Sequence, residues 1–118
     1  MVKTSKAEFA VYKDWVKHYL KKYGLNDWTV YYSHDSCESS LAQCRAQIVS
    51  RGVTFAFNKE LTKEAYEELD LRDTARHEVC HLLISDVSHL VGSFCSEDEW
   101  KRADEALVCR LTQLLDDK

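Results

Sequence analysis

The sequence predicts an α+β fold: a small, about three-stranded, mostly antiparallel sheet packed against helices from both ends of the chain. Apolar residues recur at helical period near both termini, behind capping boxes, and three short segments between them are rich in aromatic and β-branched residues. The chain has 118 residues, 45% hydrophobic and 31% charged, which fits one core with a solvated surface. We therefore expect a single domain over residues 1–118.

The first predicted element is a helix over residues 5–23. Ser5 and Glu8 have the spacing of a capping box, and Gly24 follows the last turn. The apolar residues that share one face of this helix are Phe9, Tyr12, Val16, Tyr19, Leu20 and Tyr23. We expect this face to cover one side of the sheet.

Three strands are predicted, at residues 27–32 (DWTVYY), 41–49 (LAQCRAQIV) and 53–58 (VTFAFN). Residues 33–40 are polar and are expected to form a loop. The second and third strands are separated by a short turn, so they are expected to form a hairpin. A short helix is expected to begin at Thr62.

Two longer helices complete the prediction. Asp70 is placed to cap a helix that contains residues 73–86, and Ser96 and Glu99 form a second capping box. The last helix is expected to end near Leu115. The apolar face that should pack it against the core contains Trp100, Ala103, Leu107, Leu111 and Leu114.

Composition excludes several classes of function. The formal net charge of −4 argues against a nucleic-acid partner. The five cysteines include no CxxC pair, so neither a disulfide framework nor a zinc ribbon is expected. The sequence shows no signal-peptide core and no apolar run long enough to span a membrane, so we expect a cytoplasmic protein without membrane contact.

The segment DTARHEVCHLLISD, residues 73–86, contains the candidate metal ligands and catalytic base. His77 and His81 are four residues apart and therefore project from one helix face, where neutral imidazoles can bind one Zn²⁺. Glu78 borders that face, where a general base can take a proton from a zinc-bound water. Ordinary packing of two histidines in a helix is the alternative. The residues expected to anchor the opposite face in the core are Ala75, Val79, Leu82 and Leu83.

A catalytic zinc ion needs three protein ligands and one open position. The candidates for the third ligand are His89, Glu97, Glu99, Asp104 and Glu105. Glu97 and Glu99 lie in a first helical turn, where their simplest function is capping and compensation of the helix dipole. Asp104 and Glu105 lie in the middle of a helix beside apolar residues, where a carboxylate is less easily explained. The residues alone do not decide which of these five side chains is the third ligand.

The segments RHEVCHLLI, DWTVYY, VTFAFNKEL and ALVCRL together resemble small zincin metallopeptidases, in particular short phage and prophage metallopeptidases related to the SprT-like domain. This resemblance implies a minimal zincin-like fold, bound Zn²⁺, a peptide or protein substrate, and a bacterial or phage-infected host cytosol as location. It also implies that residues 53–57 either pair with substrate as an edge strand or belong to the core sheet.

The sequence lacks features of two groups in the zincin class, the metzincins and the SprT-like proteins. Ile84 stands where the HExxHxxGxxH motif has glycine, and no zinc ribbon is present. The resemblance then implies a carboxylate from the last helix as third ligand, with Glu105 first and Asp104 second.

The leading hypothesis is therefore a zinc metallopeptidase that uses His77, His81 and Glu105 as metal ligands and Glu78 as the catalytic base. The alternatives are a non-catalytic zinc module that acts through a protein or nucleic-acid partner, and a metal-free structural protein. Substrate specificity and oligomeric state do not follow from the sequence.

Overall fold

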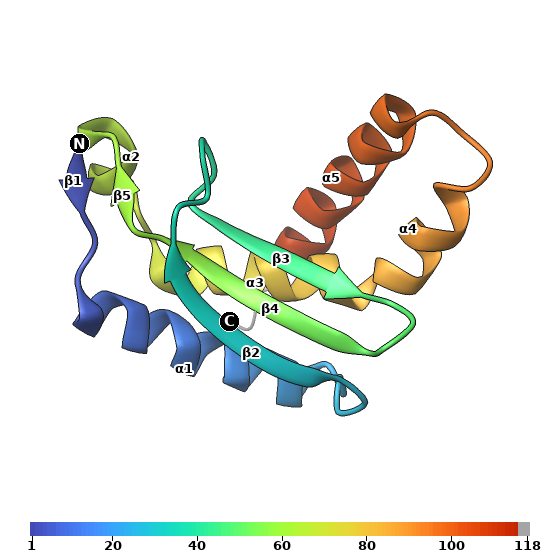
Figure 1. Ribbon diagram of the computed structural model, residues 1–118, viewed down its shortest axis with the longest axis horizontal. Coiled ribbons are helices and arrows are strands. Elements are labelled where there is room, and N and C mark those ends of the chain that lie inside the picture. The colour runs from blue at the N-terminus through green and yellow to red at the C-terminus, as the bar shows by residue number, and fades with distance from the viewer. Residues whose placement is uncertain (116–118) are drawn as a thin grey trace.

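The structure is a computed structural model that describes residues 1–115. The elements along the chain are β1 (Val2–Lys3), α1 (Lys6–Lys22), β2 (Thr29–Asp35), β3 (Ala42–Gln47), β4 (Gly52–Asn58), β5 (Glu60–Leu61), α2 (Lys63–Glu67), α3 (Leu71–Leu83), α4 (Ser85–Val91) and α5 (Glu97–Leu114). The predicted α+β class is confirmed, with a three-stranded sheet packed against helices (Figure 1).

The three-stranded sheet has the order β2-β4-β3. β3 and β4 form the predicted antiparallel hairpin, with Cys44 opposite Phe55, whereas β2 runs parallel to β4. β1 and β5 add a separate antiparallel pair, which the sequence did not predict. Residues 53–57 therefore lie in the central strand and not at an edge. β3 is the edge strand on the side of the sheet where α5 lies (Figure 1).

The core lies between the sheet and the two helices α1 and α3. Alternate residues of β4 point into it, as the period of a strand requires. The fully or nearly fully buried side chains there include Tyr12, Val16 and Tyr19 of α1, Val53, Phe55 and Phe57 of β4, and Ala75, Val79 and Leu82 of α3. Burial of each large apolar side chain contributes about 1.5–3 kcal/mol. Because three residues on one face of α3 are buried, the orientation of the whole helix is fixed.

The predicted helix starts are confirmed. Side-chain oxygens of Ser5, Asp70 and Ser96 each accept the backbone N–H three residues later, and Glu8 and Glu99 complete the two capping boxes. Leu83 was expected in the core but is 37% exposed, because α3 ends there and Ile84 is its C-cap. The chain then enters α4, which the sequence did not predict.

The predicted loop at residues 33–40 is partly wrong, because residues 33–35 continue β2. The pairing of β2 with β4 runs as far as Asp35 opposite Asn58. His34 in this segment stacks against both Phe9 and Phe57, and its Nε2 lies 2.6 Å from the Thr4 hydroxyl oxygen. These contacts with Phe9 and Thr4 near the N-terminus help to extend β2 over residues 33–35, which are polar.

The predicted buried face of α5 is also wrong. Leu107 and Leu114 are 43% and 79% exposed, whereas Val108 and Thr112 are buried. The helix is rotated so that Asp104, Val108 and Thr112 turn inward, and this rotation brings carboxylates toward α3. Within residues 1–115, no helix combines the length and apolar character needed to cross a bilayer.

Candidate metal centre

The helix α3 presents the two motif histidines side by side. The His77 and His81 rings are 5.0 Å apart between centroids and meet edge to face. Their side chains are 25% and 22% exposed, so both are reachable from solvent while the opposite face of α3 is buried. The i, i+4 spacing therefore gives the arrangement that it predicts on a helix.

The two imidazoles converge on one carboxylate from α5. His77 Nε2 lies 2.8 Å from Glu105 Oε1, and His81 Nε2 lies 3.1 Å from Glu105 Oε2. Each oxygen of Glu105 thus faces a different imidazole. The histidine pair and a glutamate more distant in sequence thus meet where α5 packs across α3.

Asp104 holds the second imidazole from its other side. Its Oδ1 lies 2.8 Å from His81 Nδ1, and its other oxygen accepts a hydrogen bond from the Ser88 hydroxyl of α4. The Asp104 side chain is only 12% exposed. A carboxylate at Nδ1 fixes the ring orientation and the tautomer, leaving Nε2 to face Glu105. Asp104, which was the second candidate for the third ligand, therefore contacts the histidine nitrogen that points away from Glu105.

Glu78 is buried between α3 and β3, with 8% of its surface exposed. It accepts a hydrogen bond from the backbone N–H of Cys44. Burial, together with the nearby negative charge of Glu105, raises the pKa of Glu78 to about 8, although the Cys44 hydrogen bond acts in the opposite direction. A carboxyl group with such a pKa can both accept and donate a proton near neutral pH.

The donor atoms form two overlapping clusters that share Glu105. One contains His81, Asp104 and Glu105, the other His77, Glu105 and Cys109, and in each the candidate donor atoms lie within 4.8 Å of one another. Each cluster holds one imidazole, and the shared Glu105 brings the two together. Two imidazole nitrogens and a carboxylate are the ligand set typical of catalytic zinc sites. The residues present therefore fit a zinc ion by the chemistry of their donors.

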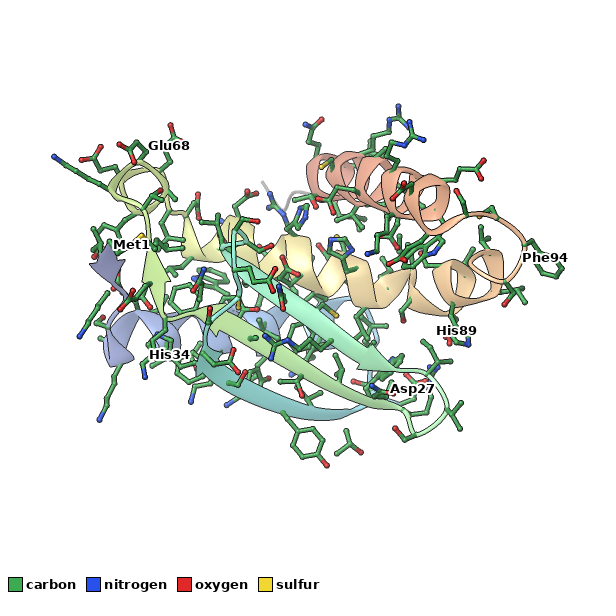
Figure 2. The ribbon with its side chains drawn as sticks, turned by 45° about the horizontal axis from the view of Figure 1, so that its top comes forward. Met1, Asp27, His34, Glu68, His89 and Phe94 are labelled. Carbon is green, nitrogen blue, oxygen red and sulfur yellow. The ribbon has the colours of Figure 1, made fainter. Side chains whose placement is uncertain are left out.

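The other predicted candidates have different surroundings. His89 lies on the exposed surface of α4 (Figure 2), Glu97 pairs with Lys101 at 2.6 Å, and Glu99 completes the capping box of α5. The structure does not place these three beside the two imidazoles. Sequence reasoning missed Cys109, although its position four residues after Glu105 repeats the spacing of the two histidines.

Two hollows flank the cluster, one of about 1050 Å³ and one of about 650 Å³. Both are bounded by Cys44, His81 and Glu105. The larger extends between β3, α4 and α5, past Ile48 and Trp100, and the smaller extends along β3 toward the start of that strand. The cluster therefore lies in the middle of an open region that follows the edge strand β3.

Comparison with known proteins does not assign a family. No protein-family model matches the chain, and no curated protein sequence matches it. One solved structure is similar, the crystal structure of the metallopeptidase zymogen of Methanocaldococcus jannaschii jannalysin. It shares 16% identity with a TM-score of 0.43, covering 94% of this chain and 96% of that chain. The functional conclusion therefore rests on the residues of the site.

Proposed function

We propose that this protein is a zinc-dependent peptidase, in which His77, His81 and Glu105 hold the metal and Glu78 is the general base. One observation carries the proposal: the Nε2 atoms of both motif histidines meet the single carboxylate of Glu105, with a buried glutamate next to the first histidine. The resemblance to small phage and SprT-like metallopeptidases belongs to the same proposal and rests on the sequence segments alone.

The bound zinc ion would supply Lewis acidity, which polarises a carbonyl and acidifies water. The chain supplies proton transfer and orientation. Glu78 takes a proton at its carboxylate and returns it to the leaving amine, which its raised pKa suits. Asp104 keeps Nε2 of His81 turned toward the metal position. The hydrogen bond from Cys44 holds the base against β3.

The substrate class follows from the edge strand and the two hollows. β3 has β4 on one side only, so its other edge offers backbone groups to an extended chain. The hollows continue on both sides of the cluster along this strand. A chain lying along β3 would therefore pass the cluster at an internal peptide bond. We infer a peptide or an unfolded protein segment as substrate, bound in extended form.

The test combines metal content with cleavage. Zinc per chain is measured by elemental analysis on protein purified without a metal-affinity tag, and cleavage is measured by mass spectrometry on a mixture of unstructured peptides. We expect one zinc per chain in the wild type, its loss in His81→Ala, and retained zinc with lost cleavage in Glu78→Gln. Glu67→Gln, an exposed glutamate of α2, is the matched control and should change neither.

Two results would contradict the proposal. Wild-type protein that takes up no zinc, even when zinc is supplied, would show that the histidine pair is only part of a packed helix. Stoichiometric zinc without cleavage, unchanged by Glu78→Gln, would favour the non-catalytic zinc module.

A further inference from the structure

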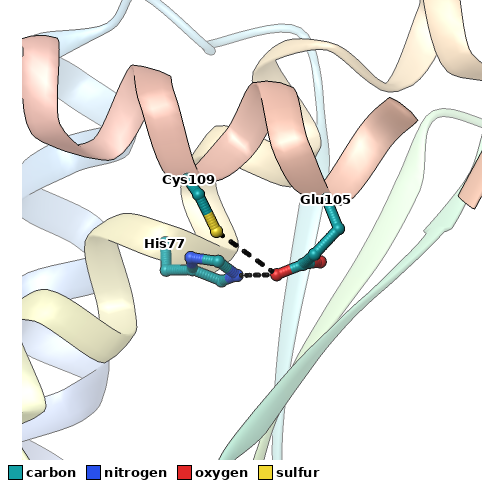
Figure 3. A group of neighbouring side chains, drawn as sticks. All are labelled: His77, Glu105 and Cys109. Carbon is teal, nitrogen blue, oxygen red and sulfur yellow. Dashed lines mark hydrogen bonds and ion pairs between the residues drawn. The ribbon is translucent and has the colours of Figure 1, made fainter. Parts of the chain in front are cut away.

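Cys109 lies beside the proposed zinc ligands. One turn after Glu105 on α5, it places its sulfur 3.9 Å from Glu105 Oε1, on the side where that oxygen contacts His77 (Figure 3). The donor atoms of His77, Glu105 and Cys109 all lie within 4.8 Å of one another. Neighbouring helices thus face each other with two i, i+4 pairs, one of histidines and one of a glutamate and a cysteine.

We propose that Cys109 is a fourth ligand of the zinc ion held by His77, His81 and Glu105, and that its thiolate closes the metal site in the resting protein. This inference rests on the proposed function. A zinc site with four protein ligands is closed, whereas hydrolysis needs an open position. Cys109 must therefore leave the metal before a substrate is hydrolysed, so the wild type is partly latent and cleaves only in the molecules whose thiol has been released.

The distances among Cys109, His77 and Glu105 are close to those of such a site. With bonds of about 2.0–2.3 Å, the donors around a tetrahedral zinc ion are separated by roughly 3.4–3.6 Å. The distance of 3.9 Å between the sulfur and the Glu105 oxygen is a few tenths of an ångström longer. Thiolate is also among the ligands that zinc prefers. Adjustments of the Cys109 and His81 side chains would bring all four donors to bonding distance, because His81 is grouped with Glu105 but not with Cys109.

The backbone of Cys109 is held in place while its side chain stays accessible. The preceding residue, Val108, is fully buried, and Thr112 in the next turn is 6% exposed. Cys109 itself is exposed. A fixed backbone with an accessible thiol allows the sulfur to bind the metal or turn to solvent without movement of α5. Release breaks only the metal–sulfur bond, and the freed thiolate takes a proton from solvent.

The other four cysteines, all within the described residues, belong to neither of the two donor clusters. Cys37 and Cys80 are buried. The Cys95 thiol donates to the carbonyl oxygen of Val91, 3.4 Å away, at the end of α4. Cys44 lies partly buried on β3 and borders both hollows beside His81 and Glu105, but it is in neither donor cluster. Cys95 is therefore a suitable control for Cys109, since it is partly accessible and belongs to another segment.

Cobalt substitution tests the proposal without relying on activity. Co²⁺ is added to the metal-free full-length chain, and thiolate ligation is detected by its sulfur-to-cobalt charge-transfer absorption. The visible ligand-field absorption reports Co²⁺ binding of any kind. We expect both signals in the wild type and in Cys95→Ser. Cys109→Ser should lose the charge-transfer absorption and keep the ligand-field absorption, and it should cleave peptides faster than the wild type when loaded with zinc.

Each other outcome has a distinct meaning. Ligand-field absorption without charge transfer in the wild type overturns the thiolate assignment and leaves the proposed peptidase intact. Charge transfer that persists in Cys109→Ser overturns it too, because another thiol is then bound. Charge transfer lost in Cys109→Ser without faster cleavage overturns latency. No Co²⁺ signal in the wild type means that the metal site, and with it the proposed function, is wrong.

Discussion

The substitution Glu78→Gln is expected to stabilise the metal-free protein, by an amount that grows with pH. The Glu78 side chain is buried and its pKa is raised from 4.5 to about 8. Between these two values the folded chain keeps a proton that the unfolded chain has released. The folded state is therefore destabilised as pH rises from 4.5 to 8, with a limiting slope of about 1.4 kcal/mol per pH unit.

The size of the effect follows from the shift. At pH 7 the pKa difference costs about 3 kcal/mol of folding free energy, and above pH 9 it costs about 5 kcal/mol. A small domain has a total stability of about 5–15 kcal/mol, so this is a large share. The amide of glutamine keeps the size of the side chain and can accept the hydrogen bond from Cys44, but it does not ionise.

The assay is urea unfolding of the wild type, Glu78→Gln and the control Glu67→Gln, with a chelator present, at pH values from 5 to 8. The chelator is needed because a bound cation would itself stabilise the ionised carboxylate. We expect the stability difference between Glu78→Gln and the wild type to be small at pH 5 and about 3 kcal/mol at pH 7. A difference that stays constant over this range, or that Glu67→Gln reproduces, would refute the assigned burial of Glu78.

Three further outcomes are expected. Asp104→Ala should lower zinc affinity by about 10–100-fold, because His81 loses the carboxylate that orients it. A competition titration against a chelating dye measures the affinity, and an unchanged value would contradict the orienting role of Asp104. Glu105→Gln should abolish stoichiometric zinc in elemental analysis, whereas the control Asp98→Asn, on the exposed first turn of α5, should retain it. Zinc retained in Glu105→Gln would exclude Glu105 as a required ligand. Tyr12→Phe should leave the free energy of unfolding in urea unchanged or raise it by about 1 kcal/mol, because the buried hydroxyl has no hydrogen-bond partner among the described residues. A loss of stability above about 1 kcal/mol would show that the hydroxyl is hydrogen-bonded.

Local signals predicted much of this fold. The capping oxygens of Ser5, Asp70 and Ser96 act within three residues, so the spacing in the sequence is enough to place the helix starts. The hairpin of β3 and β4 is likewise set by the short connection between two strand-like segments. The parallel pairing of β2 with β4 was not predicted, because it depends on how α1 and the sheet pack together.

The rotation of α5 shows where local patterns fail. Counting apolar residues favours a buried face through Leu107 and Leu114, yet both are exposed and Asp104 turns inward. The polar partners that compensate the inward carboxylate, His81 and Ser88, come from α3 and α4. Helical periodicity within α5 carries no information about partners on other helices. For the same reason the distinct surroundings of Asp104 and Glu105 could not be separated from the sequence.

The charges around the histidine pair favour a bound cation. Glu78, Asp104 and Glu105 bring three ionisable carboxyl groups to two imidazoles, and Asp104 and Glu78 are largely buried. With all three carboxylates ionised and both imidazoles neutral, the formal charge of the cluster is −3, and a divalent cation changes it to −1. Buried charge of one sign is costly unless it is paired. Without a metal, the cluster can reduce this cost by holding a proton on Glu78, which is the direction of its raised pKa. The same arrangement that weakens the metal-free protein at high pH therefore favours a divalent cation, which replaces protons as the source of positive charge.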